Sequence, residues 1–236
     1  MSSIKPITVY GHLGATPNPP KVLILLKLLG LPYTHIEKAL TDDPTVEDGI
    51  KHTNFTAINP NGRIPAITDP NQNDINVWES AAILQYLAEV YDKDYKFSGK
   101  DLEERTLINE WIAFQISGQA PMSGQFLWFS VDRLHKAKYG EQAPEHVIIR
   151  FKNEVRRIYG VLNAHLEKQK AKGSDWIVAD RLTIADVAWI PWARIIPAFD
   201  PTLLEELPAF KAWLERMDAL PAVKETYAEL NPPPMA

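Results

Sequence analysis

Apolar and polar residues follow two different rhythms along this chain of 236 residues. Through residue 92, short apolar runs with strand-like alternation are separated by runs with helical spacing. Beyond residue 100 every apolar run has helical spacing, and the polar segment "DKDYKFSGKDLEER" between the two parts is typical of a linker. The pattern predicts two domains, a mixed α/β domain over residues 1–92 and an all-helical domain over residues 100–230.

The first domain is expected to combine a βαβ unit with a ββα unit, which together form a four-stranded mixed sheet with helices on its faces. "PNQND" is rich in turn residues and predicts a hairpin between the last two strands. The strands are expected at 7–11, 33–40, 63–69 and 75–80, and the helices at 19–29 and 80–91.

The second domain is expected to hold helices near 101–131, 144–170, 183–196 and 208–219. Thr183 and Asp186 have the spacing of a capping box before an apolar run, and we interpret them as structural. The closing "LNPPPMA" is too rich in proline to be helical.

Charge and composition narrow the class of protein. The formal net charge is −5, and basic residues are interspersed with acidic ones, so nucleic acid is not expected as a partner. No run approaches the roughly 18 apolar residues of a membrane span, and the first residues do not have the pattern of a signal peptide. We therefore expect a cytoplasmic protein with no membrane partner.

Two residue types restrict the chemistry. The chain has no cysteine, which excludes disulfides, cysteine-ligated zinc and a cysteine nucleophile, so any thiol must come with a ligand. The six histidines show no metal-ligand spacing, and no metal is expected.

"TPNPPKVLILLKLLG" contains a helix start in which Asn18 precedes two prolines, and Gly30 marks the end. The simplest interpretation makes Asn18 an N-cap whose side-chain oxygen accepts a hydrogen bond from the first turn. The amide NH₂ group would then remain able to donate to an anion at the helix start.

Two further motifs allow both a structural and a binding interpretation. In "NPNGRIPAI", Pro65 fits the start of an edge strand, or a cis Ile64–Pro65 bond that turns the backbone of Ile64 toward a bound peptide. In "WESAAILQYL", Ser80 fits a helix cap and Glu79 an acid at the helix start, or the pair fits a site for a zwitterion.

A third segment, "SGQAPMSGQFLWFSVDRL", interrupts a predicted helix with two glycines and a proline. Met122, Phe126 and Trp128 in this segment fit either a packed core or the wall of a site for flat apolar molecules.

Taken together, "TPN", "NPNGRIPAI", "WESAAILQYL" and "LTIADVAWIPW" resemble the cytosolic glutathione transferases over nearly the whole chain. "SGQAPMSGQ" and "FKNEVRRIYGVL" are similar to the branch that contains the globular domain of the yeast nitrogen-regulatory prion protein, which is nu-class-like. The resemblance implies a thioredoxin-like domain that binds glutathione as co-substrate, a helical domain that shapes the electrophile site, and a homodimer.

The resemblance also implies roles for single residues. Thr16 and Asn18 match the pair near the glutathione sulfur, Ile64 before cis-Pro65 pairs with the cysteinyl backbone, and Arg63 belongs to the same motif. Glu79 and Ser80 match the pair that holds the γ-glutamyl end. Arg150 matches an arginine that reaches glutathione from the partner subunit.

One position departs from the family pattern. Relatives carry a His, Gln or Lys that contacts the glycyl carboxylate, whereas strict spacing in "GIKHTNF" places Ile50 there. His52 is our preferred substitute, with Lys51 as the alternative.

The resemblance predicts a transferase in which Asn18 stabilises the glutathione thiolate for attack on a hydrophobic electrophile or a disulfide, with disulfide reductase or peroxidase activity as further options and detoxification as the context. Tyr10 is the rival activator, although a ring packed at the domain contact is the simpler interpretation of that residue. The alternative function is that of a glutathione-fold binding or regulatory protein with little turnover.

Overall fold

The computed structural model describes residues 4–12, 14 and 16–230, and its contacts divide the chain into two compact units. The first unit combines Met1–Ser98 with Asp218–Ala236, and the second is Gly99–Met217. The sequence-based ranges of 1–92 and 100–230 differ from these units mainly at the C-terminal end. Residues 231–236 of the proline-rich tail lie outside the described part of the chain.

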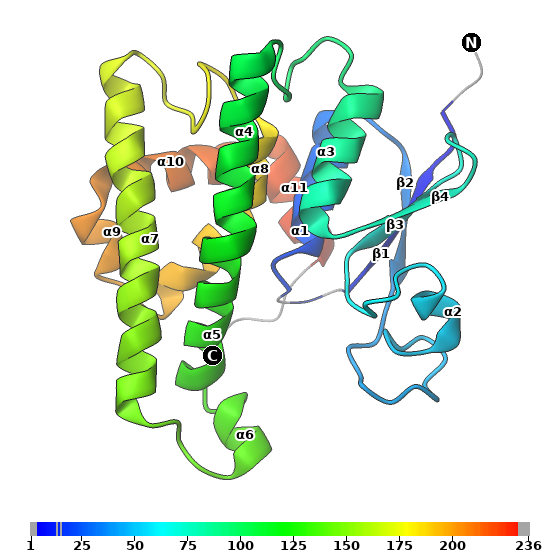
Figure 1. Ribbon diagram of the computed structural model, residues 1–236, viewed down its shortest axis with the longest axis horizontal. Coiled ribbons are helices and arrows are strands. Elements are labelled where there is room, and N and C mark those ends of the chain that lie inside the picture. The colour runs from blue at the N-terminus through cyan, green and yellow to red at the C-terminus, as the bar shows by residue number, and fades with distance from the viewer. Residues whose placement is uncertain (1–3, 13, 15, 231–236) are drawn as a thin grey trace. The chain divides into compact units, whose positions relative to one another are not determined.

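A four-stranded mixed sheet forms the centre of the first unit, as predicted (Figure 1). Its order is β2-β1-β3-β4, with β1 parallel to β2 and antiparallel to β3, and with β3 antiparallel to β4. The parallel pair requires the crossover helix α1, and the antiparallel pair is closed by the predicted hairpin. The strands are β1 Ile7–Gly11, β2 Tyr33–Glu37, β3 Ala66–Asp69 and β4 Ile75–Trp78.

Two helices, α1 (Pro19–Leu28) and α3 (Ser80–Tyr91), pack against each other and against the sheet. Every residue of α1 from Pro19 to Leu26 is buried, so this helix lies in the core on all sides. Ile7, Val9 and Ile67 are fully buried on the sheet, as alternation along a half-covered strand requires. A short helix, α2 (Thr53–Thr56), was not predicted, because one turn carries no detectable period.

The last helix of the chain, α11 (Pro221–Leu230), was also not predicted, and it belongs to the first unit. Figure 1 shows it in red beside α1, with which it is in contact. Pro221 begins the helix, where a proline is tolerated, and Ala222, Thr226 and Leu230 are buried at intervals of four. Lys27 of α1 is joined to Glu229 of α11 at 2.9 Å.

The described part of the second unit is helical, as the sequence predicts (Figure 1). Helix α5 packs on α7, and α4 packs on α8. Two short helices, α6 and α9, were not predicted. The helices are α4 Leu102–Phe114, α5 Ala120–Ser130, α6 His135–Tyr139, α7 Glu145–Ala171, α8 Ile184–Ile195, α9 Leu203–Glu206 and α10 Pro208–Ala219, with a 3₁₀ turn at Ile196–Ala198.

A π-helical turn, Gln115–Gln119, joins α4 to α5 where the sequence predicts an interrupted helix. Pro121 has no N–H to donate, and the N–H of Ala120 bonds to Gln115 O, five residues back. Gln119 is fully buried there, and its Nε2 donates to Tyr159 Oη and to Trp189 O, both at 3.1 Å. The interruption therefore positions a buried polar network.

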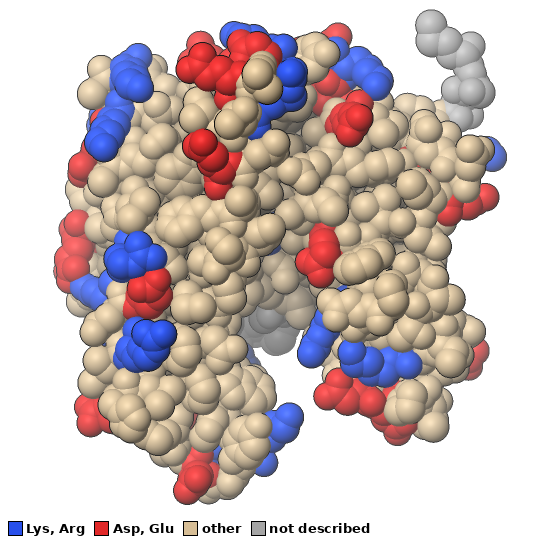
Figure 2. All heavy atoms as spheres, in the orientation of Figure 1, with Lys and Arg blue, Asp and Glu red and all other residues tan. Residues whose placement is uncertain are grey.

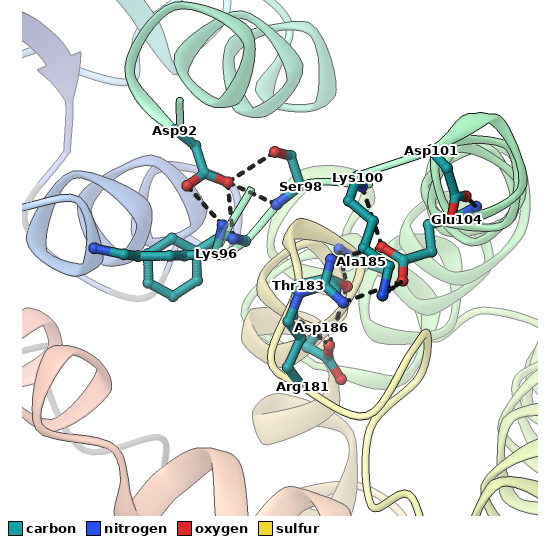
Figure 3. Close-up of polar contacts among 11 residues, drawn as sticks. Asp92, Lys96, Ser98, Lys100, Asp101, Glu104, Arg181, Thr183, Ala185 and Asp186 are labelled. Atoms are coloured by element: carbon teal, nitrogen blue, oxygen red, sulfur yellow. Dashed lines mark hydrogen bonds and ion pairs between the residues drawn. The ribbon is translucent and has the colours of Figure 1, made fainter. Parts of the chain in front are cut away.

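The predicted capping box of α8 is confirmed (Figure 3). Thr183 Oγ1 accepts from Ala185 N, and Asp186 Oδ2 accepts from Thr183 N at 2.9 Å. The carboxylate of Asp186 also accepts from Ile177 N at 3.1 Å and from Trp213 Nε1 at 2.8 Å, so it ties α8 to the preceding loop and to α10.

Charged side chains of both signs are interspersed over the face drawn in Figure 2. Many form local pairs within one unit, such as Arg156 with Asp200 at 2.5 Å and Arg181 with Glu104 at 2.6 Å. Within the described residues, no helix is both long and apolar enough to cross a membrane.

Candidate functional site

The strand register brings three of the predicted motifs to one end of the sheet. Tyr10, near the end of β1, is opposite Ala66 at the start of β3, and Ala66 is opposite Trp78 at the end of β4. The segment that leads into α1 therefore begins beside Ile64–Pro65, and Glu79–Ser80 follow β4 at the same end of the sheet, on the other side of β3. These positions are far apart in the sequence. They lie at the same end of the sheet because β3 is antiparallel to both of its neighbours.

Asn18 occupies the N-cap position of α1, as predicted, but its side chain makes no capping hydrogen bond, so that part of the prediction was wrong. The reason is the two prolines that follow, Pro19 and Pro20, because neither has an N–H to donate. The next N–H, of Lys21, donates to the backbone oxygen of Asn18 at 3.2 Å. The start of α1 thus keeps its dipole but presents few backbone donors to a ligand.

The hydroxyl of Thr16 lies two residues before this helix start. Its Oγ1 atom is buried and has no hydrogen-bond partner among the described residues. Burying a hydroxyl without a partner costs about 1–3 kcal/mol. An unpaired buried hydroxyl at a helix start is a reason to expect a polar ligand atom there.

Two side chains fix the backbone of the loop before β3 by hydrogen bonds. Asn59 is 1% exposed, its Nδ2 donates to Arg63 O at 2.6 Å, and its Oδ1 accepts from Asn61 N at 3.0 Å. Lys51 Nζ donates to Asn61 O and to Gly62 O, both at 3.1 Å. The backbone of the loop is therefore fixed, while the side chain of Arg63 is exposed.

The Ile64–Pro65 peptide bond is cis, as the sharper interpretation of this motif predicted. No hydrogen bond of the Ile64 backbone is found within the described residues. Its side chain packs half-buried against the cluster of Ile50, Phe55 and Ala66. Ile64 thus sits beside a strand start with a firmly packed side chain.

Glu79 and Ser80 open α3, but Ser80 lies inside the helix and the Glu79 side chain makes no capping bond, so the interpretation of Ser80 as the cap was wrong, while Glu79 is an acid at the helix start, as expected. Glu79 takes the N-cap position with φ +71, a conformation that L-residues rarely adopt, and Ser80 is the first helical residue. Glu79 is exposed, and its Oε1 accepts from Asn61 Nδ2 at 3.5 Å. Backbone conformations of this kind cost about 1–3 kcal/mol and cluster at ligand sites.

Lys21 is a site residue that the sequence analysis missed. It is 1% exposed, and its Nζ donates to Ser80 Oγ at 3.2 Å. Burial lowers the pKa of Lys21 to about 7, and the charge of Glu79 acts in the opposite direction. The available signal was its spacing, because Lys21 lies four residues before Leu25, which belongs to the apolar stripe of α1.

Tyr10 belongs to a packed cluster. Its ring lies 5.7 Å from the ring of Phe55, and its hydroxyl accepts from Thr68 Oγ1 at 3.5 Å. These contacts favour the packed-ring interpretation, although the partners come from the first unit itself.

The three positions considered for the glycyl end differ in their surroundings. Ile50 is 3% exposed and belongs to the core, so it has no polar group to offer. His52 caps α2, with Nδ1 accepting from Asn54 N at 3.3 Å. Lys51 holds the loop carbonyls next to Arg63, and the choice of His52 stays a prediction.

Within the second unit, the three residues considered for an apolar site all lie on α5. Phe126 is 3% exposed and belongs to the core, as the structural interpretation held. Met122 and Trp128 are half-exposed, and Lys138 Nζ lies 5.8 Å from the centre of the Trp128 ring. Arg150 is exposed on α7, with its guanidinium carbon 5.6 Å from the Phe151 ring.

The described residues contain no group of three or more His, Asp or Glu side chains placed to hold a metal ion. What the first unit assembles at the sheet end is a buried hydroxyl, a fixed loop, an acid and a buried cation.

Family models match both parts of the chain: "Glutathione S-transferase, N-terminal domain" over residues 16–90 and "Glutathione S-transferase, C-terminal domain" over residues 133–221. The chain is 42% identical to the glutathione S-transferase-like protein tpcF of Aspergillus fumigatus, covering 98% of this chain and 99% of that one. It is 32% identical to the transcriptional regulator URE2 of Saccharomyces cerevisiae, covering 92% of this chain and 66% of that one.

A solved structure, that of the glutathione transferase URE2P6 from Phanerochaete chrysosporium in complex with oxidized glutathione, is 37% identical with a TM-score of 0.83. The match covers 96% of this chain and 97% of that one. The chain therefore belongs to the glutathione transferase family, in the branch of the Ure2-like members.

Proposed function

We propose that this protein binds glutathione at the sheet end described above, activates its thiolate, and transfers it to small hydrophobic electrophiles. The observation that carries the proposal is the buried Thr16 hydroxyl without a partner among the described residues, next to Asn18 at the start of α1. Membership of the family supports glutathione as the ligand. The strand register supports a single site, because it brings the motifs to one end of the sheet.

The thiol end of glutathione would lie at Thr16 and Asn18. A thiol with a pKa of about 8.5 is only a few per cent ionised at pH 7, and lowering that pKa to about 6.5 corresponds to about 2.7 kcal/mol. The α1 dipole and a charge-assisted hydrogen bond together reach this size. Because Pro19 and Pro20 remove backbone donors, the side chains of Asn18 and Thr16 must supply the hydrogen bonds.

The γ-glutamyl end is a zwitterion, and Glu79 with Ser80 suits both of its charges. Glu79 would pair with the ammonium, and Ser80 together with the first N–H groups of α3 would hold the carboxylate. Unlike α1, α3 has no proline in its first turn. Between the two ends, the backbone of Ile64 would pair with the cysteinyl residue as an added strand, with Arg63 and His52 nearest the glycyl end.

The second substrate would contact Met122 and Trp128, the half-exposed pair on α5, with Phe126 behind them as packing. A hydrophobic electrophile or a disulfide fits these side chains. Attack of the thiolate on a disulfide would give a reductase, and attack on a peroxide oxygen would give a peroxidase. We further propose a homodimer in which Arg150 reaches glutathione held by the partner subunit.

The similarity to the transcriptional regulator URE2 supports a second candidate function, that of a glutathione-binding regulator with little turnover. One pair of assays separates the two functions: conjugation of glutathione to a chlorodinitrobenzene, and glutathione-dependent reduction of a small dialkyl disulfide, each beside calorimetric binding of glutathione. Turnover above the uncatalysed rate in either assay supports the transferase. Binding without turnover supports the regulator, and absence of binding contradicts both.

A further inference from the structure

A buried lysine connects the two helix starts of the candidate site. Lysine is among the residue types that are least often fully buried, yet Lys21 in the first turn of α1 is 1% exposed. Its Nζ reaches the first residue of α3, where it donates to Ser80 Oγ at 3.2 Å. The two helices pack against each other, so this contact lies inside the first unit.

The direction of this hydrogen bond constrains the serine. A lysine ammonium is only a donor, whereas a serine hydroxyl has one hydrogen and two lone pairs. Since Ser80 Oγ accepts from Lys21, its own hydrogen must point toward a different acceptor. A carboxylate is a suitable acceptor, and the exposed Glu79 next to it suits the ammonium of the same ligand.

We propose that Lys21 is a positioning residue for glutathione: by donating to Ser80 Oγ, its buried ammonium turns the hydroxyl hydrogen of Ser80 toward the γ-glutamyl carboxylate. This inference rests on the proposed function, because it takes the γ-glutamyl end of glutathione as the occupant of Ser80.

The electrostatics of Lys21 support this arrangement and make it dependent on pH. Burial lowers the pKa of Lys21 to about 7, so the free protein holds a mixture of charged and neutral lysine near neutral pH. A carboxylate bound at Ser80 adds a negative charge close to Nζ, which favours the charged form and raises the pKa. Binding is then coupled to proton uptake by Lys21.

Among the charged groups of the described residues on the elements around α1, Glu79 raises the pKa of Lys21. Glu229 on α11 is engaged by Lys27 and by Tyr33. Tyr86 and Tyr91 on α3 donate to Asp69, and Tyr10 on β1 packs on Phe55.

The experiment measures binding of S-methylglutathione, which has no thiol to titrate, to the parent and to Lys21→Met. Because Lys21 is charged below its free pKa, the affinity of the parent should be highest near pH 6 and fall about tenfold or more by about pH 9. Calorimetry in buffers with different ionisation enthalpies should show proton uptake by the parent near neutral pH. Lys21→Met should bind more weakly at low pH, with a flatter profile and less proton uptake.

Two comparisons separate the effect of Lys21 on binding from the effects of other titrating groups. The ligand's own ammonium also titrates in this range, and Lys21→Met retains that contribution, so the difference between parent and variant belongs to Lys21. Lys27→Met, a change in the same helix at a lysine paired with Glu229, should leave the pH profile of binding unchanged. Thermal unfolding of each variant shows that it is folded.

The outcomes are distinct. If the parent binds S-methylglutathione and folded Lys21→Met shows the same affinity and pH profile, Lys21 has no positioning role and the proposed function stands. If Lys21→Met does not fold, Ser80→Ala takes its place. Proton uptake and a fall in affinity that are both larger in the parent than in Ser80→Ala support the role, and equal values in the two proteins contradict it. A parent that fails to bind at any pH contradicts both the role and the proposed function.

Discussion

The ring of Tyr10 lies 5.7 Å from the ring of Phe55, while Asn18 stands at the start of α1 with no capping bond to make. The two candidates for activating a thiol therefore differ in their surroundings. The hydroxyl of Tyr10 contacts Thr68 within the sheet, whereas Asn18 lies at the positive end of a helix dipole.

We expect Asn18→Ala to lower the rate with glutathione far more than Tyr10→Phe. The first change removes the proposed donor to the sulfur, and the pKa of the bound thiol should rise by about one or more. The second retains the ring on Phe55 and loses only a long hydrogen bond. Ultraviolet titration of bound glutathione measures the thiol pKa, and the same pKa in Asn18→Ala as in the parent would contradict the assignment.

The zwitterion site makes a second prediction. Glu79→Ala and Ser80→Ala should each weaken glutathione binding about tenfold or more, because each leaves a charged end of the ligand without its partner. Calorimetry measures the affinity, and Glu89→Ala, at an exposed acid further along α3, is the matched control. Parent-like affinity in both site variants would place the γ-glutamyl end elsewhere.

The backbone of Glu79 allows binding and stability to be separated. Its φ of +71 suits glycine better than any L-residue. Glu79→Gly should therefore be more stable than Glu79→Ala by about 1 kcal/mol, while both lose affinity for glutathione. Urea unfolding of the two variants measures the difference in free energy, and an equal or lower stability of the glycine variant would show that the backbone relaxes at this position.

Local patterns were sufficient to predict much of the fold. The sequence predicts a helix over residues 80–91, and α3 spans Ser80–Tyr91, because the apolar period and the flanking turn signals agree there. The four strands were also predicted, but three of them were predicted two or three residues too long, because the sequence pattern does not show where the pairing ends. Helix α11 was not predicted because its ten residues begin with a proline, precede a proline-rich segment and depend on packing against α1.

The site was harder to predict because its details depend on contacts between distant segments. Part of the reason why Asn18 makes no capping bond is visible in the sequence, because the two prolines that follow it have no N–H. The hydrogen bond from the Lys21 N–H to the Asn18 carbonyl is visible only in the structure. The burial of Lys21 against Ser80 joins residues 59 positions apart. No local pattern contains that contact, although the spacing of Lys21 and Leu25 could have indicated burial.

A fourth prediction concerns stability and pH. Burial raises the pKa of Asp186 to about 6 from its ordinary value of 3.8, against the hydrogen bonds that it accepts. An acid whose pKa is raised by folding binds its proton more tightly in the folded state than in the unfolded state. The contribution of Asp186 to the free energy of unfolding is therefore largest below about pH 4 and falls as the pH rises to about 6.

The change from about pH 4 to above pH 6 corresponds to about 3 kcal/mol for this group. Asp186→Asn does not titrate and should be less stable, since its NH₂ group faces N–H donors. The free energy of unfolding of the parent should therefore exceed that of this variant by less as the pH rises. Other titrating groups contribute equally to both proteins, so their contributions cancel in this difference. Urea unfolding at several pH values measures it, and an advantage that grows with pH would contradict the assignment.

The last prediction concerns assembly. Arg150 is exposed on α7, and the proposed homodimer would use it on glutathione held by the partner subunit. Arg150→Ala should then weaken glutathione binding about tenfold while the chain stays dimeric, and dilution of the parent to monomer should weaken binding as well. Arg157→Ala is the matched control, because Arg157 lies on the same helix but is bound to Glu154 of its own chain at 2.7 Å. Sedimentation combined with a glutathione titration measures both quantities, and a monomer with the full affinity of the dimer would show that the partner subunit contributes nothing to the site.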